Sequence, residues 1–268
     1  MQTKIKKYLV LGNPIEHSLS PKLQNFWLKK YDINATYDKI KLQDNEIEAV
    51  IQDIKKQKIA GCNVTVPFKK KVITFLDRLS LEATQTQSVN TIIFDDGKLV
   101  GHNTDIYGFE NAIKNLNFSI NNKSVLILGA GGVVPSIIFA LEKMHVSKIN
   151  ITNRTKERAE NIKTLFSNIN VLEWGNLPDF DVIINATSLG LNNENINLDL
   201  SKVGKNKLFY DVIYNPEETN FLREGKKSGN LSENGKLMFI YQAVEAFNLW
   251  HGVRPNIDDQ TIKLLNNG

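Results

Sequence analysis

Two polar clusters in this chain contain residue types that could move a proton. The segment Asn63–Lys69 ends in a lysine, and a second cluster, Gly101–Asp105, ends in an aspartate. A lysine near a loop-borne aspartate can take a proton from an alcohol, and the aspartate can orient both partners. Downstream, the apolar run Val125–Leu128 leads directly into a glycine-rich turn, Gly129–Gly132. A proton acceptor combined with a nucleotide-binding turn predicts alcohol oxidation by hydride transfer.

The glycine-rich turn follows a predicted strand and opens a predicted helix, which is the context that makes such a pattern credible. Glycines let the backbone approach a pyrophosphate, which then lies at the helix N-terminus. The alternative is a structural turn without a ligand. Val134 is bulkier than the small residue usual at the third position, and Pro135 fits a first helical turn. The residues expected to contact the cofactor here are Gly129, Ala130, Gly131, Gly132 and Val133.

The next strand end indicates which nucleotide is bound. An NAD site usually carries an acidic residue there that accepts from the ribose hydroxyls. This chain instead has Asn153-Arg154-Thr155-Lys156-Glu157-Arg158, with two arginines four residues apart. Guanidinium groups match a phosphate bidentately, so Asn153, Arg154, Thr155 and Arg158 favour NADP over NAD. Two solvated arginines on a helix are the alternative.

Composition excludes several classes of protein. The 268 residues are 41% hydrophobic and 23% charged, as in ordinary soluble proteins, and the net charge is +4. The lysines are scattered among acidic residues, which indicates a solvated surface rather than a nucleic-acid site. No apolar run approaches the roughly 18 residues of a membrane-spanning helix.

Cys62 is expected to be a small buried residue, and neither His17 nor His102 has the spacing of a metal site. We therefore expect a cytoplasmic protein without a metal.

Strands and helices alternate along the first hundred residues. Ser20 is predicted to cap a helix that has Pro21 in its first position. A second helix places Ile47, Val50, Ile51 and Ile54 on one face. Asp95-Asp96-Gly97 supplies the turn of a hairpin. The predicted strands are Lys7–Gly12, Thr36–Ile40, Ile59–Val64, Val89–Phe94 and Lys98–Val100.

The second block repeats strand–helix units, which predicts an α/β fold with a doubly wound parallel sheet. A domain boundary is expected near Thr104–Gly108, where the hairpin gives way to a helix. The helices from Gly235 onward have no strand after them and are expected to pack back on the first domain. The predicted strands are Ser124–Leu128, Lys148–Thr152, Asn170–Leu172, Asp181–Asn185 and Leu208–Val212.

The stretch Gly12–Pro21 resembles the signature of the shikimate dehydrogenase family, and the resemblance extends across nearly the whole chain. The resemblance is specific to this family because many motifs match and they occur in the same order along the chain. Besides the clusters above, the matching segments are Ser88–Thr91, Asn185–Ser188, Tyr210–Pro216 and Met238 through Ala243. The resemblance implies a three-layer α/β/α substrate-binding domain over residues 1–106 and a Rossmann-type NADP domain over 107–234. C-terminal helices over 235–268 would return to the substrate domain.

Shikimate carries a carboxylate and three ring hydroxyls, and this chain has side chains that suit both. In an extended loop Ser18 and Ser20 would point the same way, which suits a carboxylate, with Thr65 as a third hydroxyl. Asn90, Asp105 and Gln242 supply the donors and acceptors that ring hydroxyls require. Tyr214 is either a substrate contact or a packed aromatic.

By resemblance, the reaction is the reversible NADP-linked interconversion of 3-dehydroshikimate and shikimate. Lys69 is assigned as the acid–base group and Asp105 as its orienting partner, although the sequence does not decide which of them accepts the proton. Leu237 stands where the family commonly has a small residue, which leaves Gly235 as the expected contact to the nicotinamide, with Val212 beside it. No nucleic acid or membrane partner is expected, and a homodimer is compatible with the sequence.

Two other functions stay open. A quinate/shikimate dehydrogenase that uses NAD would share the scaffold. A catalytically silent NADP-binding regulatory module would keep the cofactor site alone, but the intact Lys69 and Asp105 argue against it.

Overall fold

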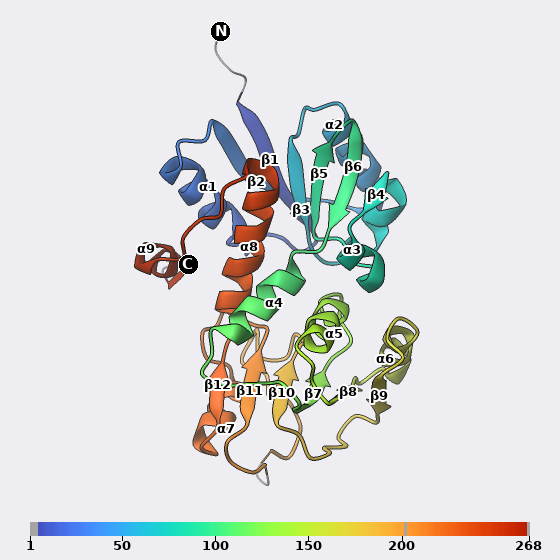
Figure 1. The fold of residues 1–268 in the computed structure, drawn as a ribbon, viewed down its shortest axis with the longest axis vertical. Coiled ribbons are helices and arrows are strands. Elements are labelled where there is room, and N and C mark those ends of the chain that lie inside the picture. Colours follow the sequence, from blue (N-terminus) through green and yellow to red (C-terminus); the bar gives the residue numbers. More distant parts are fainter. Residues whose placement is uncertain (1–4, 201–202, 267–268) are drawn as a thin grey trace. The chain divides into compact units, whose positions relative to one another are not determined.

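The computed structural model describes residues 5–200 and 203–266, which form two compact units. The first unit comprises residues up to Thr104 together with residues from Gln242 onward. The second is the continuous segment Asp105–Tyr241. The second unit is therefore inserted into the chain of the first (Figure 1).

The first unit is built on a mixed six-stranded sheet with the order β2-β1-β3-β5-β6-β4. β1 lies parallel to both β2 and β3, whereas β5 runs antiparallel to β3 and β6. The predicted hairpin is confirmed, because Asp96 and Gly97 have positive φ angles of 47° and 73° in its turn. The strands are β1 (Lys6–Gly12), β2 (Ala35–Lys41), β3 (Gly61–Val64), β4 (Arg78–Leu79), β5 (Thr91–Asp95) and β6 (Lys98–His102).

Helices cover both faces of this sheet. Successive side chains of a strand point to opposite faces, and β1 carries apolar residues on both. Leu9 and Leu11 of β1 pack with the buried face of α2 (Ile47–Lys55), which is the amphipathic helix predicted from the sequence. Tyr8, which precedes Leu9, packs against Trp250 of α8 (Lys236–His251) on the other face. The predicted three-layer α/β/α arrangement is therefore confirmed. The remaining helices of this unit are α1 (Ser20–Lys30), η1 (Asp44–Glu46), η2 (Lys71–Phe75), α3 (Leu81–Thr86) and α9 (Asp259–Asn266).

The second unit contains a fully parallel six-stranded sheet with the order β12-β11-β10-β7-β8-β9. From β7 the chain moves outward through β8 and β9, then returns to the other side of β7 through β10, β11 and β12. This is the strand order of the dinucleotide-binding fold, with its switch point between β7 and β10. The strands are β7 (Ser124–Leu128), β8 (Lys148–Thr152), β9 (Ile169–Leu172), β10 (Val182–Asn185), β11 (Leu208–Asp211) and β12 (Leu231–Glu233).

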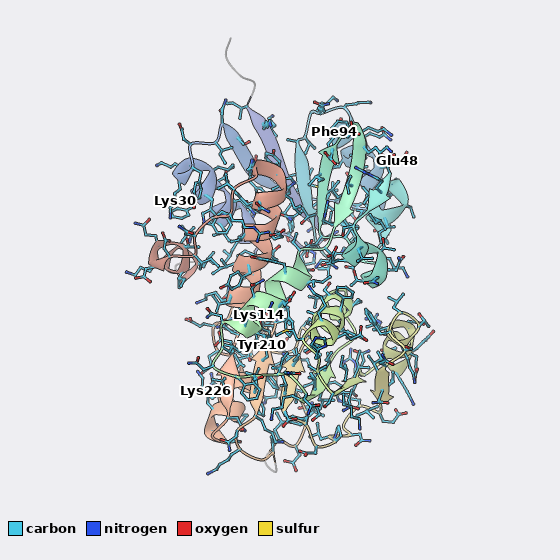
Figure 2. All side chains as sticks on the ribbon, viewed as in Figure 1. Lys30, Glu48, Phe94, Lys114, Tyr210 and Lys226 are labelled. Atoms are coloured by element: carbon cyan, nitrogen blue, oxygen red, sulfur yellow. The ribbon has the colours of Figure 1, made fainter. Side chains whose placement is uncertain are left out.

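Two apolar clusters cover the two faces of the second sheet. Val125 and Ile127 belong to one cluster and Leu126 and Leu128 to the other, so alternate residues of β7 face opposite layers. Tyr210 lies in the first cluster against Phe109, whereas Lys226 is exposed at the surface (Figure 2). The helices are α4 (Asp105–Lys114), α5 (Val134–Lys143), α6 (Lys156–Lys163) and α7 (Asn220–Lys227).

Two short strands, β4 and β12, were not predicted from the sequence. Within the described ranges, no helix is long and apolar enough to cross a bilayer.

Candidate active site

The candidate substrate residues of the first unit lie along one edge of its sheet. Ser18 lies in the loop after β1 and Ser20 begins α1, and the loop after β3 carries Thr65 and Lys69. Because β5 runs antiparallel to β3, its first residue pairs with Asn63, and Asn90 precedes that residue at the same edge. The strand order thus gathers these side chains at the carboxyl ends of β1 and β3.

Ser20 does not cap the first helix, so that prediction is wrong. Leu19 occupies the cap position with helical angles (φ −87°, ψ −2°), and Ser20 is the first helical residue. The Ser20 N–H donates to Ser18 Oγ at 3.3 Å, so Ser18 supplies the acceptor at this helix start. The extended-loop reason for the two serines pointing together is also wrong, because Leu19 turns the chain. The serines are nevertheless joined by this hydrogen bond.

Lys69 differs from the two lysines that follow it. Its side chain is half-buried, whereas Lys70 and Lys71 are exposed and Lys71 pairs with Asp44. The preceding Phe68 is fully buried in the core of the first unit, and the Lys69 carbonyl accepts from the Val89 N–H at 2.9 Å. The backbone that carries Lys69 is therefore anchored on both sides, although the lysine itself lies in a polar run.

The side chain of Asn90 holds the segment that leads into Asp105. Its Oδ1 accepts from the Thr104 N–H at 2.7 Å, and its Nδ2 donates to Thr104 Oγ1 at 2.9 Å. Both residues are buried. Asp105 is the first residue of α4 and of the second unit, and its side chain is 6% exposed. Asn90 therefore fixes the turn immediately before Asp105, a role that the sequence did not reveal.

Tyr214 and Gln242 lie in different units. Tyr214 stacks on Phe239 with ring centroids 4.7 Å apart and 26° between the planes, and burial raises the pKa of Tyr214 to about 12. Its ring is thus packed, and its hydroxyl stays protonated at neutral pH. Gln242 belongs to the first unit, where α8 packs on the sheet.

The glycine-rich turn in the second unit lies at the switch point of the sheet. Gly129 has φ +107°, a backbone conformation that favours glycine, and a Cβ atom there would lie 2.8 Å from the Ala186 carbonyl oxygen. α5 begins shortly afterwards, with Pro135 in its first turn as predicted and Val134 fully buried in the core. Gly129 is therefore packed against the Ala186 backbone. At Gly131 a Cβ atom would meet nothing nearer than the Ala186 carbonyl oxygen at 3.8 Å, which leaves room for a ligand's phosphates at the start of α5.

Arg154 and Arg158 are exposed where α6 begins. Asn153 Nδ2 donates to the Thr155 carbonyl at 2.7 Å and closes the turn between them. Among the residues that the structure describes, neither guanidinium forms an ion pair, whereas the neighbouring Lys156 pairs with Glu173. This arrangement suits an external phosphate group.

A buried aspartate that was not among the predicted site residues organises the ends of β10 and β11. Asp211 accepts from Asn185 Nδ2 at 3.0 Å, from the Ile213 N–H at 3.0 Å and from Thr219 Oγ1 at 2.6 Å. Burial raises the pKa of Asp211, and these hydrogen bonds oppose that rise. An acidic residue at a strand end could have been noticed, but its partners become apparent only in three dimensions.

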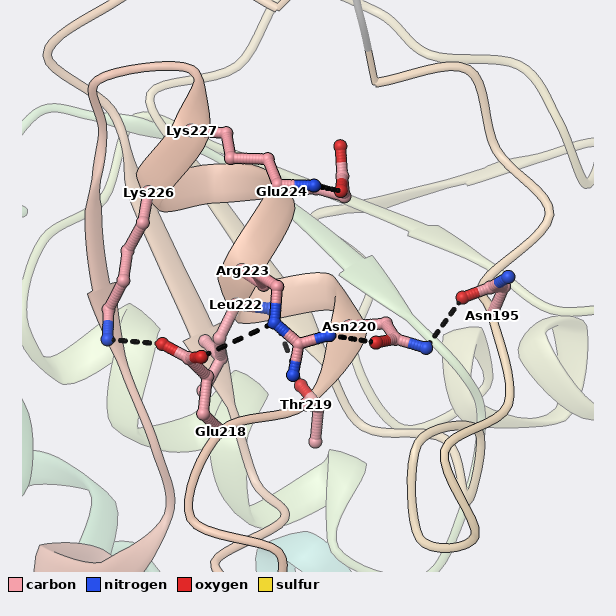
Figure 3. A network of polar contacts seen from close by, with 9 residues as sticks. All are labelled: Asn195, Glu218, Thr219, Asn220, Leu222, Arg223, Glu224, Lys226 and Lys227. Atoms are coloured by element: carbon pink, nitrogen blue, oxygen red, sulfur yellow. Dashed lines mark hydrogen bonds and ion pairs between the residues drawn. The ribbon is translucent and has the colours of Figure 1, made fainter.

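Thr219 also caps α7 by accepting from the Leu222 N–H, beside a surface network in which Glu218 pairs with Arg223 and Lys226 (Figure 3). The loop that carries Val212 and Tyr214 is therefore held at both ends.

Gly235 has a structural reason to be glycine. A Cβ atom on it would lie 2.2 Å from the Val212 carbonyl oxygen, and its N–H donates to the Ile213 carbonyl at 3.0 Å. Val212 and Gly235, two predicted cofactor contacts, are thus adjacent at the carboxyl ends of β11 and β12.

Three family profiles match most of the chain. Residues 10–92 match the shikimate dehydrogenase substrate binding domain. Residues 110–215 match the shikimate/quinate 5-dehydrogenase profile, and residues 237–259 match the shikimate 5'-dehydrogenase C-terminal domain.

Known relatives and solved structures agree with these profiles. The shikimate dehydrogenase (NADP+) of Pelagibacter ubique is 56% identical over 97% of this chain and 98% of its own length. The shikimate dehydrogenase structure from Aquifex aeolicus has a TM-score of 0.90 at 33% identity, covering 99% of both chains. The Thermus thermophilus enzyme, solved with NADP(H) and shikimate, has a TM-score of 0.90 at 28% identity, covering 98% of this chain and 99% of its own.

Proposed function

The chain belongs to the shikimate dehydrogenase family, and we propose how its own residues carry out the NADP-dependent interconversion of 3-dehydroshikimate and shikimate. The protein is an NADP-dependent oxidoreductase of aromatic amino acid biosynthesis. The observation that carries this assignment is the 56% identity with a shikimate dehydrogenase (NADP+) over nearly the full length of both chains.

We assign the substrate to the first unit and the cofactor to the second, in line with the profile of a substrate binding domain over residues 10–92. The second unit fits a dinucleotide, because a Cβ at Gly131 would meet no atom nearer than 3.8 Å and the strand order matches the nucleotide-binding fold. When bound, NADPH supplies the hydride for the ring ketone. Gly129–Val133 would hold its pyrophosphate, and Asn153, Arg154, Thr155 and Arg158 would hold its 2′-phosphate, with Val212 and Gly235 beside the nicotinamide.

The carboxylate of the substrate is received by hydroxyl groups at the edge of the first sheet. Ser18 Oγ accepts from a backbone N–H, so its own proton is available to donate outward. Ser20 and Thr65 complete this set of hydroxyls. A carboxylate bound by hydroxyl donors gains charge-assisted hydrogen bonds, which are shorter and stronger than neutral ones.

The proton step is assigned to Lys69 and Asp105. During reduction one of them delivers a proton to the oxygen of the ring ketone, and during oxidation it removes the proton from the same hydroxyl. Lys69 is held by a rigid backbone, and Asp105 follows the turn that Asn90 and Thr104 fix. Asn90 and Gln242 are proposed to hold the ring hydroxyls, with the Tyr214 hydroxyl as a further donor.

An absorbance assay of NADPH tests the proposed function. Purified protein should reduce NADP with shikimate and give a much smaller rate with quinate and NAD. Comparable rates with quinate and NAD would identify a quinate/shikimate dehydrogenase instead. A flat trace with every acid tested would indicate a protein that binds NADP without catalysis.

A further inference from the structure

Tyr37, on the edge strand β2, lies outside the residues assigned above but bonds to one of them. Its hydroxyl donates to Asn63 Oδ1 at 2.6 Å and also hydrogen-bonds the Ser20 side chain. The phenol is fully buried, and burial raises the pKa of Tyr37, so its proton stays on the oxygen at neutral pH. A tyrosine in a strand is ordinarily a packing residue, which is why this contact could not be predicted from the sequence.

The direction of donation in this network is fixed by the Asn63 amide. Its Nδ2 donates to the Asn90 carbonyl at 3.0 Å and to Thr91 Oγ1 at 2.9 Å, so both amide protons are used. Asn63 Oδ1 must therefore face Tyr37 and accept its proton. The Tyr37 oxygen is then left to accept from the Ser20 hydroxyl, and this bond holds Ser20 Oγ in place until a substrate carboxylate takes that proton.

The chain of hydrogen bonds continues to the segment before Asp105. Thr91 Oγ1 donates to Asn90 Oδ1 at 3.1 Å. Asn90 Oδ1 also accepts from the Thr104 N–H. Within the first unit, buried hydrogen bonds thus connect the serine that would receive the substrate's acid with Thr104. All of the side chains in this network are at most 8% exposed.

Tyr37 is itself held rigidly. Asn25 of α1 donates to the Tyr37 carbonyl at 2.7 Å and accepts from the Tyr37 N–H at 3.0 Å, and α1 is the helix that begins at Ser20. The Tyr37 ring packs near Trp250 with centroids 6.0 Å apart. The hydroxyl therefore occupies a fixed point relative to the start of α1.

We propose that Tyr37, with Thr91 behind Asn63, is a positioning residue of the substrate site. Its hydroxyl, oriented by the Asn63 amide that Thr91 helps to hold, sets where Ser20 Oγ lies without touching the substrate. Removing the hydroxyl would leave the buried Asn63 Oδ1 without its donor and free Ser20 to change rotamer. This inference rests on the proposed function, because it concerns the site that receives the substrate's carboxylate.

The test is the variant Tyr37→Phe, which keeps the ring and removes only the hydroxyl. The Michaelis constant for shikimate should rise about five- to twentyfold, as expected for one lost buried hydrogen bond, while kcat and the Michaelis constant for NADP stay within about twofold. The matched control is Tyr8→Phe, in the same sheet and against the same Trp250, which should leave all three constants within about twofold.

A double-mutant cycle separates positioning from general destabilisation. If Tyr37 acts through Ser20, adding Tyr37→Phe to Ser20→Ala should raise the Michaelis constant by less than about twofold more. Effects that multiply fully, or an unchanged Michaelis constant in the single variant, would overturn the proposal.

Thr91 provides a second route if Tyr37→Phe does not fold. Thr91→Val should raise the Michaelis constant for shikimate, and Thr91→Ser, which keeps the hydroxyl, should restore it. Equal constants in Thr91→Val and the wild type would also overturn the proposal. A wild-type protein that does not turn over shikimate would instead refute the proposed function.

Discussion

At the scale of single residues, neighbouring side chains of the same type have different surroundings. Of three consecutive lysines, Lys69 alone is half-buried on an anchored backbone, and of the paired serines, Ser18 accepts a backbone N–H while Ser20 bonds to Tyr37. Each such contrast supplies a variant and its matched control within the same short segment.

Lys69→Ala should reduce turnover far more than substrate binding. An acid–base group typically contributes about 10²–10⁴-fold to the rate, so kcat should fall by that factor. The control is Lys71→Ala, which loses only a surface pair with Asp44 and should keep kcat within about twofold. Steady-state kinetics with shikimate and NADP measure both, and near-normal turnover in Lys69→Ala would remove this lysine from the mechanism.

Replacing Arg154 and Arg158 together with alanine should weaken NADP much more than NAD. Only the 2′-phosphate loses its guanidinium partners, and a loss of about 100-fold in NADP affinity corresponds to charge-assisted bonds of ordinary strength. The matched control is Lys156→Ala between them, which pairs with Glu173. Titrations of both cofactors followed by tyrosine and tryptophan fluorescence measure the effect, and equal losses for NADP and NAD contradict the assignment.

Ser18→Ala should raise the Michaelis constant for shikimate about tenfold, as expected for the loss of a charge-assisted hydrogen bond to the carboxylate. It should also cost about 1 kcal/mol of stability, because Ser18 supplies the acceptor at the start of α1. An analogue that lacks the carboxylate distinguishes the two roles. If the mutation weakens that analogue as strongly as shikimate, the serine shapes the loop and does not bind the acid.

At the scale of elements, the packing of α8 on the first sheet creates a pH dependence. His251 near the end of α8 lies between the rings of Tyr8 and Phe247, and burial, together with the nearby Lys6, lowers the pKa of His251 from 6.5 to about 4. A lowered folded-state pKa favours the neutral imidazole. The stabilisation is therefore complete above pH 6.5 and is lost as the pH falls from 6.5 towards 4.

The variant His251→Phe keeps the aromatic contacts and removes this titration. Between pH 7 and pH 5 the wild type should lose about 1 kcal/mol more of its free energy of unfolding than the variant, after allowing for partial exposure of the ring. Urea unfolding at the two pH values gives the difference. Parallel losses in the two proteins would show that His251 is not responsible.

Secondary structure was predictable where apolar runs are long and buried, and less so elsewhere. Ser124–Leu128 and Lys148–Thr152 were predicted to the residue, because the first is an apolar run after a polar residue and the second alternates polar residues with isoleucines. Arg78–Leu79 and Leu231–Glu233 were missed, since such short segments become strands only by pairing with β6 and β11. The gathering of Thr65, Lys69 and Asn90 at one edge follows from strand order. The hydrogen-bond partners of these residues could not be predicted, because the partners come from segments that are distant in the sequence.

At the scale of the whole molecule, the second unit is one continuous segment of the chain, whereas the first unit is made of two separate segments. Among the described residues, the buried members of the larger apolar cluster of the second unit run from Ile106 to Met238, all within that unit. The first unit needs α8, since Trp250 donates to the Ile92 carbonyl at 3.1 Å and Phe247 packs on Trp27. A fragment of residues 105–241 should therefore fold, unfold cooperatively on heating and bind NADP. A fragment of residues 1–104 should not show a cooperative unfolding transition.

Circular dichroism during heating and NADP titration of the two fragments test this expectation. A fragment of residues 1–104 that melts as sharply as the full-length protein would show that α8 is dispensable for the first unit. A fragment of residues 105–241 that fails to fold would show that the second unit depends on the first.

The insertion of one unit within the other also fixes the order in which a nascent chain can mature on the ribosome. When synthesis has just passed Tyr241, every residue of the later-encoded unit has been made, but the earlier-encoded unit still lacks the turns of α8 that carry Phe247 and Trp250. Domains generally fold as units during synthesis, starting from the N-terminus. Here we expect the second unit to be completed first. The face of the first unit that carries Tyr8, Trp27 and Tyr37 stays exposed until α8 has been translated. Chaperones that recognise apolar surface would therefore bind the nascent chain at that stage.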